Sequence, residues 1–373
     1  MVIKTRRAVF LIPKRTRSRS FACHTISARS RLECAERACR SLLSAGSIAE
    51  NNQVHLMKHH LVSVKLPLLV VICSLALGLT TGCSSSIPEF DQSRAFGFLK
   101  QQVDFGPRYP GAPAHMTTAD FIVSNLKPYA DNVTVQQFTQ TIKGKKLDLQ
   151  NIIAFFNPSA KHCVLLAAHW DTRPIADMEV DPAKVATPIP GANDGASGVA
   201  VLLELARVFA KQKPDVGVMM VFFDGEDYAT IPPSADTMFL GSIYFAKHLR
   251  ESTSIDGKPV KLSYGILLDM IGDKDLKIYE EGNSNDSAPE VVDNVWNTAG
   301  DLGYGKQFVP SIKYSISDDH LPLIKAGIKC IDVIDFNYGP WHTLDDTVDK
   351  CSPESLKVVG DVISHVIYKE KKF

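Results

Sequence analysis

Four predominantly apolar runs constrain the fold of this chain more than any other feature of its sequence. They cover residues 163–168, 216–223, 264–270 and 329–334. Runs of this length, without alternation of apolar and polar side chains, are typical of inner strands in a sheet covered on both faces. With 45% hydrophobic and 22% charged residues, the chain is also too apolar to be a disordered protein.

Helical segments lie between these strands. Residues 197–211 carry apolar side chains at helical spacing, which predicts an amphipathic helix. Further helices are expected at 121–126, 241–250 and 352–368, and further strands at 133–141 and 149–156. Alternating strands and helices predict an α/β fold, a three-layer sandwich around a central, mostly parallel mixed sheet.

Polar clusters follow the ends of these strands, and sheets of this kind bind ligands beyond the carboxyl ends of their strands. The clusters contain His169, Glu226, Asp227 and Asp269, and Asp194 immediately precedes the helix at 197–211. Two more clusters, Asp-Asp-His at 318–320 and Trp-His-Thr at 341–343, occur nearer the C-terminus. Each has an ordinary structural explanation alone, such as a helix N-cap or a solvated loop, but together they indicate one site.

The chemistry of these clusters suits a zinc ion. Three carboxylate or imidazole groups from separate loops form the usual ligand set of a catalytic Zn²⁺, which keeps a fourth position open for substrate. A carboxylate beside a ligand can then act as a general base. The cysteines beyond residue 83 are Cys163, Cys330 and Cys351, and none has a partner at Cys-x-x-Cys spacing, so a thiolate site is not expected.

Several of these segments resemble a known superfamily. His-Trp-Asp at 169–171, Asn-Asp-Gly-Ala-Ser-Gly at 193–198 and Glu226-Asp227 are similar to motifs of the zinc-aminopeptidase superfamily. Within it, the chain resembles glutaminyl-peptide cyclotransferases at residues 106–108, 222–226, 267–272, 318–322 and 341–346. The resemblance covers residues 90–370 and implies a zinc-aminopeptidase-like fold, with a catalytic domain at 84–373.

The resemblance implies one zinc ion per chain, held by Asp194, Asp227 and His342. The position of Asp227 is a glutamate in the animal enzymes, so here the loop must approach the metal more closely. Glu226 would be the catalytic acid and base.

Further roles follow from the same resemblance. Asp269 and Asp318 would form an acidic, hydrogen-bonded group near the base, and Trp341 would be the flat wall of the substrate pocket. His169, oriented by Asp171, would join the acidic network without binding a second metal. A second pocket tryptophan of the animal enzymes has no match at residues 228–238.

The reaction that the resemblance implies is cyclisation of an N-terminal glutamine to pyroglutamate with release of ammonia. The alternative on the same fold is a metalloaminopeptidase, in which His169, Asp194 and Asp269 complete a second metal site. A third hypothesis is a surface lipoprotein that binds peptide N-termini without turnover.

The N-terminal region predicts export. Met57 opens a positively charged segment, and an apolar run at 66–79, too short to span a bilayer comfortably, leads into Leu-Thr-Thr-Gly-Cys at 79–83. This resembles a lipoprotein signal peptide, with Cys83 lipidated and the protein facing the periplasm of a bacterial envelope. We expect residues 1–56 to reflect an upstream start codon chosen in error; a genuine basic tail or transit peptide is the alternative.

Charge distribution bears on the partners. Residues 1–56 carry 11 basic and 3 acidic side chains, whereas residues 57–373 carry 30 basic and 38 acidic ones. A mildly acidic domain argues against nucleic acid as a partner. We expect peptides or proteins with N-terminal glutamine as substrates, contact with the membrane only through the lipid anchor, and a monomer.

Overall fold

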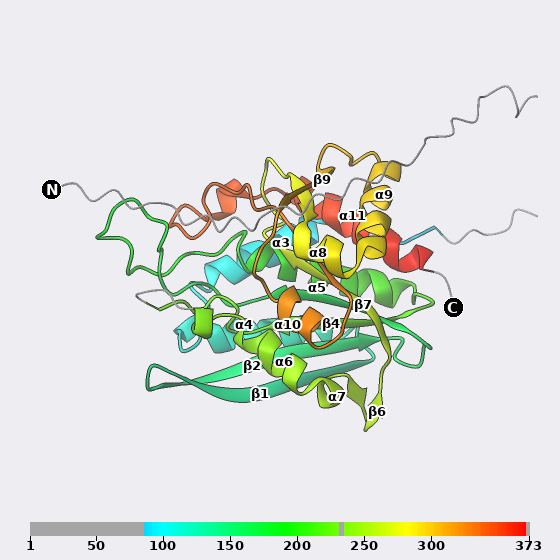
Figure 1. The fold of residues 1–373 in the computed structure, drawn as a ribbon, viewed down its shortest axis with the longest axis horizontal. Helices are drawn as coiled ribbons and strands as arrows, with labels where there is room; N and C mark the ends of the chain where they lie inside the picture. The colour runs from blue at the N-terminus through cyan, green and yellow to red at the C-terminus, as the bar shows by residue number, and fades with distance from the viewer. Residues whose placement is uncertain (1–85, 231–234, 371–373) are drawn as a thin grey trace, which may run out of the picture. The chain divides into compact units, whose positions relative to one another are not determined.

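The computed structural model describes residues 86–230 and 235–370 (Figure 1). Cys83 and the predicted signal peptide lie outside the described residues. Within the described part of the chain, every helix is too short or too polar to cross a lipid bilayer.

The centre of the fold is a six-stranded mixed sheet with the strand order β1-β2-β4-β3-β7-β10. The strands β3, β4, β7 and β10 run parallel, while β2 pairs antiparallel with β4 and β1 pairs antiparallel with β2. Their bounds are β1 Asn132–Ile142, β2 Lys145–Phe156, β3 Cys163–His169, β4 Gly217–Phe223, β7 Leu262–Asp269 and β10 Cys330–Ile334. The predicted mostly parallel mixed sheet is therefore confirmed.

Helices cover both faces of the sheet, because strand residues alternate between two hydrophobic clusters. Along β4, Met220 and Phe222 pack toward one face, and Met219 and Val221 toward the other. The first face is covered by α3 Gln92–Asp104, α4 Pro113–Leu126, α5 Ala196–Lys211, α9 Pro289–Asp301 and α11 Pro353–Lys369; Figure 1 shows α3, α5 and α11 together. The second is covered by α6 Leu240–Lys247, α7 Leu249–Ser252 and α10 His320–Lys325.

Smaller elements complete the described residues. They are the pairs β5 Ser254–Ile255 with β6 Lys258–Pro259 and β8 Ile278–Glu281 with β9 Phe308–Tyr314, the helix α8 Gly282–Ser287, and short 3-10 turns at Ala235–Thr237 and Val348–Lys350.

Three predicted elements have boundaries that differ from the structure. The helix expected at 121–126 begins earlier, at Pro113, a residue type favoured in the first turn of a helix. The strand expected at 149–156 begins at Lys145, because β2 pairs with β1 across a tight turn in which Lys143 has φ 49° and Gly144 has φ 79°. The single helix expected at 241–250 is two helices, since the backbone leaves helical geometry at His248 with φ −108° and ψ 29°.

The strand order positions a crevice at one edge of the sheet. From β3 the chain places β4 on one side, and later β7 and β10 on the other, so the order of strands reverses at β3. Such a reversal separates the loops at the carboxyl ends of the strands and opens a binding crevice there. His169 and Asp269 are the last residues of β3 and β7.

Candidate active site and metal centre

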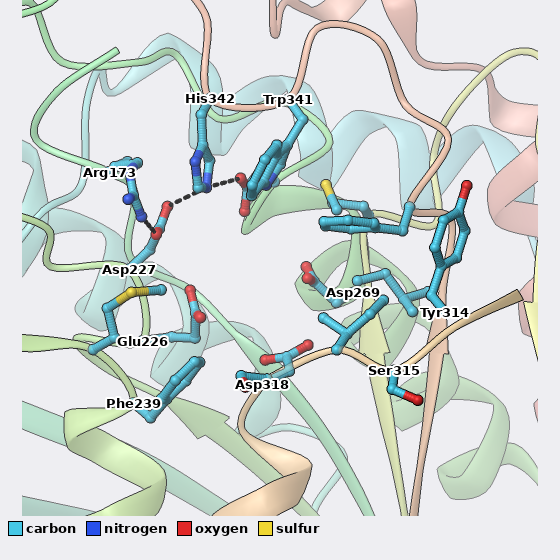
Figure 2. Close-up of a pocket in the computed structure, with 17 residues that line it drawn as sticks. Arg173, Glu226, Asp227, Phe239, Asp269, Tyr314, Ser315, Asp318, Trp341 and His342 are labelled. Carbon is cyan, nitrogen blue, oxygen red and sulfur yellow. Dashed lines mark hydrogen bonds and ion pairs between the residues drawn. The ribbon is translucent and has the colours of Figure 1, made fainter. Parts of the chain in front are cut away.

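The polar clusters predicted at the strand ends meet in one cavity of about 450 Å³ (Figure 2). Its charged and imidazole lining comprises Arg173, Asp194, Glu226, Asp227, Asp269, Asp318 and His342. Four aromatic rings line the same cavity: Phe239, Tyr314, Phe336 and Trp341. Every predicted catalytic, metal-binding or substrate-binding side chain of the domain therefore reaches the cavity, with His169 and Asp171 buried beside it.

The three residues predicted to bind zinc lie together. One possible ligand atom from each of Asp194, Asp227 and His342 lies within 4.8 Å of the other two. His342 Nε2 is 3.6 Å from Asp194 Oδ2 and 3.5 Å from Asp227 Oδ2. Both of these carboxylate oxygens are buried and have no hydrogen-bond partner among the residues that the structure describes, a costly arrangement that a cation would relieve. Two carboxylates and one imidazole suit Zn²⁺ with an open position.

Backbone geometry at the start of α5 places Asp194. Gly195 is the N-cap residue with φ 97°, and a Cβ there would lie 2.4 Å from the carbonyl oxygen of Asp171. The backbone N–H groups of Asn193 and Asp194 donate to the Asp346 carboxylate at 2.8 and 3.1 Å. Because Gly195 occupies the cap, the Asp194 side chain is not the N-cap and is free to face the cavity.

A chain of ion pairs that sequence reasoning missed joins the other two predicted ligands, Asp227 and His342. Arg173 donates from Nη1 to Asp227 Oδ1, and from Nε and Nη2 to the two oxygens of Asp177 at 2.8 and 3.0 Å. Asp177 Oδ1 is also 3.4 Å from His342 Nδ1. Burial opposes ionisation of Asp177, but His342 and Arg173 lower its pKa to about 2. The sequence signal was an arginine two residues after the His-Trp-Asp cluster.

Trp341 and His342 form one rigid wall of the cavity. Their rings stack with centroids 3.8 Å apart, and Phe336 meets Trp341 edge-on at 5.0 Å. His342 adopts φ 57°, which is unfavourable for a residue with a Cβ and persists only where surrounding contacts impose it. Phe239, Tyr314 and Phe336 give the rim its aromatic character.

Glu226 occupies the position expected of a proton acceptor. Its carboxyl group lies in the cavity beside Asp227 and is 7% exposed. Burial, followed by the charge of Asp227, raises its pKa well above the usual glutamate value. Its backbone N–H donates to Asp171 Oδ1 at 3.0 Å, and that of Asp227 donates to Asp171 Oδ2 at 3.3 Å. Asp171 therefore holds the loop that carries both residues.

His169 lies between two carboxylates. Its Nε2 is 3.1 Å from Asp194 Oδ1 and 3.1 Å from Asp269 Oδ1, and these three residues also form a group that could hold a metal. Nδ1 is 3.6 Å from Asp171 Oδ1, longer than a hydrogen bond. The orientation of His169 by Asp171 stays a prediction.

The predicted acidic group is close in space but is not directly bonded to the base. Asp269 accepts from His169, and Asp318 Oδ1 accepts the backbone N–H of Asp319 at 2.5 Å. Among the described residues, no hydrogen bond joins the Glu226 side chain to either. Burial and the charge of Asp269 raise the pKa of Asp318 to about 6.

A second acidic cluster lies behind Asp318. His320 Nε2 is 3.4 Å from Glu281 Oε2, and His320 Nδ1 is 3.8 Å from Asp332 Oδ2. All of these side chains are at most 3% exposed. Sequence reasoning noticed His320 but not Glu281 or Asp332, which come from β8 and β10.

The chain is similar to proteins of one family. Residues 151–367 match the model of peptidase family M28. A Bacteroides thetaiotaomicron glutaminyl cyclase, solved with N-acetylhistamine bound, shares 38% identity at a TM-score of 0.72, over 77% of this chain and 100% of that one. The glutaminyl-peptide cyclotransferase of Drosophila melanogaster is 28% identical over 68% of this chain and 75% of its own length.

An aminopeptidase of Bacillus subtilis is also similar, at 30% identity over 67% of this chain and 52% of its own length. The fold, the cavity at the sheet edge and the match over more than half of the sequence all indicate the same family. The chain is a member of peptidase family M28.

Proposed function

We propose that the protein is a glutaminyl-peptide cyclotransferase, which converts the N-terminal glutamine of peptides to pyroglutamate and releases ammonia. One observation carries the proposal: a buried carboxylic acid, Glu226, lies beside three side chains that could hold a metal ion, in a cavity walled by Trp341. Relatives named for this activity support it.

Glu226 would transfer the proton. The substrate α-amine attacks its own side-chain amide carbonyl, forming the ring C–N bond and breaking the bond to the amide nitrogen. An α-amine has a pKa near ~7.7 and is largely protonated at neutral pH. Glu226 would take the proton from the amine and return it to the departing ammonia.

Asp194, Asp227 and His342 would hold the zinc ion, which supplies Lewis acidity to the amide carbonyl when bound. Arg173 and Asp177 would hold Asp227 and His342 in position. The aromatic walls formed by Trp341, Phe239 and Phe336 would confine the glutamine side chain and exclude water, favouring attack by the amine.

We propose that one zinc ion per chain is sufficient. Cyclisation brings its own nucleophile, so a second metal has no water to activate. His169 Nε2 is at hydrogen-bond distance from Asp269, consistent with a role as a hydrogen-bonding group.

A metalloaminopeptidase is the second candidate, because His169, Asp194 and Asp269 could hold another metal. Purified, zinc-loaded protein should be incubated with a Gln-peptide and with a Leu-anilide. Cyclisation predicts ammonia release and a peptide lighter by one ammonia, with no residue lost. Release of the first amino acid or of the aniline would instead support the peptidase.

We also propose that the domain is a lipoprotein anchored through Cys83 and facing the periplasm. The support is the sequence at 66–83 alone. Expression from Met57 in a competent bacterial host should give a processed, membrane-associated protein that Cys83→Ser converts to an unlipidated form. Untrimmed protein in the cytoplasm would contradict the proposal.

A further inference from the structure

A second groove leads away from the active-site cavity between α6 and α10. It encloses about 520 Å³. Phe239, Ile243 and Lys247 line one side, and Ser317, Leu321 and Lys325 line the other. Ile243 and Lys247 share one face of α6, and Leu321 and Lys325 share one face of α10. Phe239 and Ser317 precede these helices.

The groove adjoins the active site. Phe239 and Ser317 line both the groove and the active-site cavity. The backbone N–H of Phe239 donates to the carbonyl oxygen of Glu226 at 2.8 Å. Figure 2 shows the Phe239 ring beside Glu226, on the side of the cavity where Asp318 also lies. The groove therefore begins next to the proposed base.

The proposed reaction places the next residue of the substrate near the base. The α-amine that Glu226 deprotonates and the carbonyl that leads to the next residue are attached to the same Cα atom. With the glutamine side chain toward the zinc ligands, the rest of the peptide leaves from the Glu226 side of the cavity, where the groove starts.

The charged side chains of the groove are lysines, whereas those of the active-site cavity are mainly carboxylates. Lys247 and Lys325 are exposed, and no acidic side chain is among the described residues that line the groove. Neither lysine forms an ion pair within the described part of the chain. Both lie in the last turn of their helices, where a cation stabilises the helix dipole. The helix dipole does not explain why the two lysines line opposite sides of one groove.

We propose that this groove binds the segment of the substrate that follows the N-terminal glutamine, and that Lys247 and Lys325 select an acidic side chain in it. The proposal rests on the proposed cyclotransferase function. The eight residues of α6, Leu240–Lys247, span about 12 Å, which an extended peptide covers in about four residues. The favoured acidic residue would therefore be the third to fifth of the peptide.

The test uses six-residue peptides with N-terminal glutamine and otherwise alanine, carrying one Glu or one Lys at each later position in turn. For the zinc-loaded wild type we expect kcat/KM to favour Glu over Lys at positions three to five, by about two- to five-fold for each lysine, as for exposed ion pairs. Raising the salt concentration should reduce the preference.

Charge-changing variants identify the residues responsible. Lys247→Gln and Lys325→Gln should each reduce the preference, and the double charge reversal K247E/K325E should invert it. The dipeptide Gln-Ala, too short to reach either lysine, should react equally in all variants. Lys211→Glu is the matched control, since Lys211 is an exposed lysine in the last turn of α5, outside this groove.

Two results would overturn the proposal: equal kcat/KM for Glu and Lys peptides in the wild type, or the same change of preference in Lys211→Glu. A groove that serves another partner would give the first result. Failure of the underlying function looks different, because the wild type would then release no ammonia even from Gln-Ala.

Discussion

At the scale of single residues, a substitution at Glu226 should affect catalysis without affecting metal binding. Glu226→Gln should bind zinc and fold like the wild type but lose about 10²- to 10⁴-fold in kcat, the usual contribution of a general base. Ammonia release and metal analysis measure the two properties. A variant with wild-type turnover would show that another group moves the proton.

The same residue sets a pH dependence. A base must be ionised to accept the proton of the amine, and burial raises the pKa of Glu226 well above its usual value. The rate should therefore fall as the pH is lowered through this raised pKa, at a higher pH than the ~4.3 of a free glutamate would give. An acid limb of kcat that stays near pH ~4.3 would contradict this assignment.

Asp177 offers a second residue-scale prediction, because it touches Arg173 and His342 but does not line the cavity. Asp177→Asn should weaken zinc binding by about 10- to 100-fold, as loss of a partner behind a metal ligand does, while kcat at saturating zinc changes little. Competition with a chelating dye measures the affinity. Asp181→Asn, an exposed aspartate on the same loop, is the matched control, and an equal loss in that variant would refute the role.

At the scale of elements, Glu281 ties α8, β9 and α10 together. Its carboxylate accepts the backbone N–H groups of Asn283 and Ser284, which caps α8, and also that of Ile316 in the cavity wall. Glu281→Gln should lower the free energy of unfolding by about 1–3 kcal/mol, the range for lost buried hydrogen bonds to a charged group.

The sign of its pH dependence follows from the pKa. Burial opposes ionisation, but His320 and the N–H donors lower the pKa of Glu281 to about 2 in the folded protein. This stabilisation is therefore present above the unfolded value of ~4.3 and is lost as the pH falls toward about 2. Urea unfolding of the zinc-free protein should show the wild type and Glu281→Gln converging in acid. Glu280→Gln, its half-buried neighbour, should show no such convergence.

At the scale of the whole molecule, the zinc ion would connect loops from distant parts of the chain. Asp194, Asp227 and His342 follow β3, β4 and β10 respectively. Zinc at about 100 times its Kd should stabilise the fold by about 2.7 kcal/mol, which would be measured as a higher Tm.

His342→Ala should lose both the metal and the stabilisation, whereas His169→Ala should keep one zinc and lose only part of the activity. Two zinc ions per chain, both required for cyclisation, would overturn the single-metal proposal and favour the peptidase.

The sequence alone determined four buried strands, β3, β4, β7 and β10, and which side chains stand at their ends. The prediction that all four are inner strands was wrong for β10, which is the edge strand of the sheet although its residues are buried. Strand identity is local, because a continuous apolar run can only be buried on both sides. The convergence of Asp194, Asp227 and His342 was predictable because parallel strands bring their carboxyl ends to one edge. The exact start of β2 and the break at His248 depend on pairing and packing with other elements, so the local pattern missed them.

Tertiary structure decided everything that depends on long-range partners. Arg173 reaches Asp227 across 54 residues of sequence, and Asp346 holds the backbone of Asp194 across 152. The residues beside Arg173 and Asp346 in the sequence do not identify the partner of either side chain. Their roles exist only once burial removes water, because a charge deprived of solvent must find a partner in the protein, and the fold determines which one lies within reach.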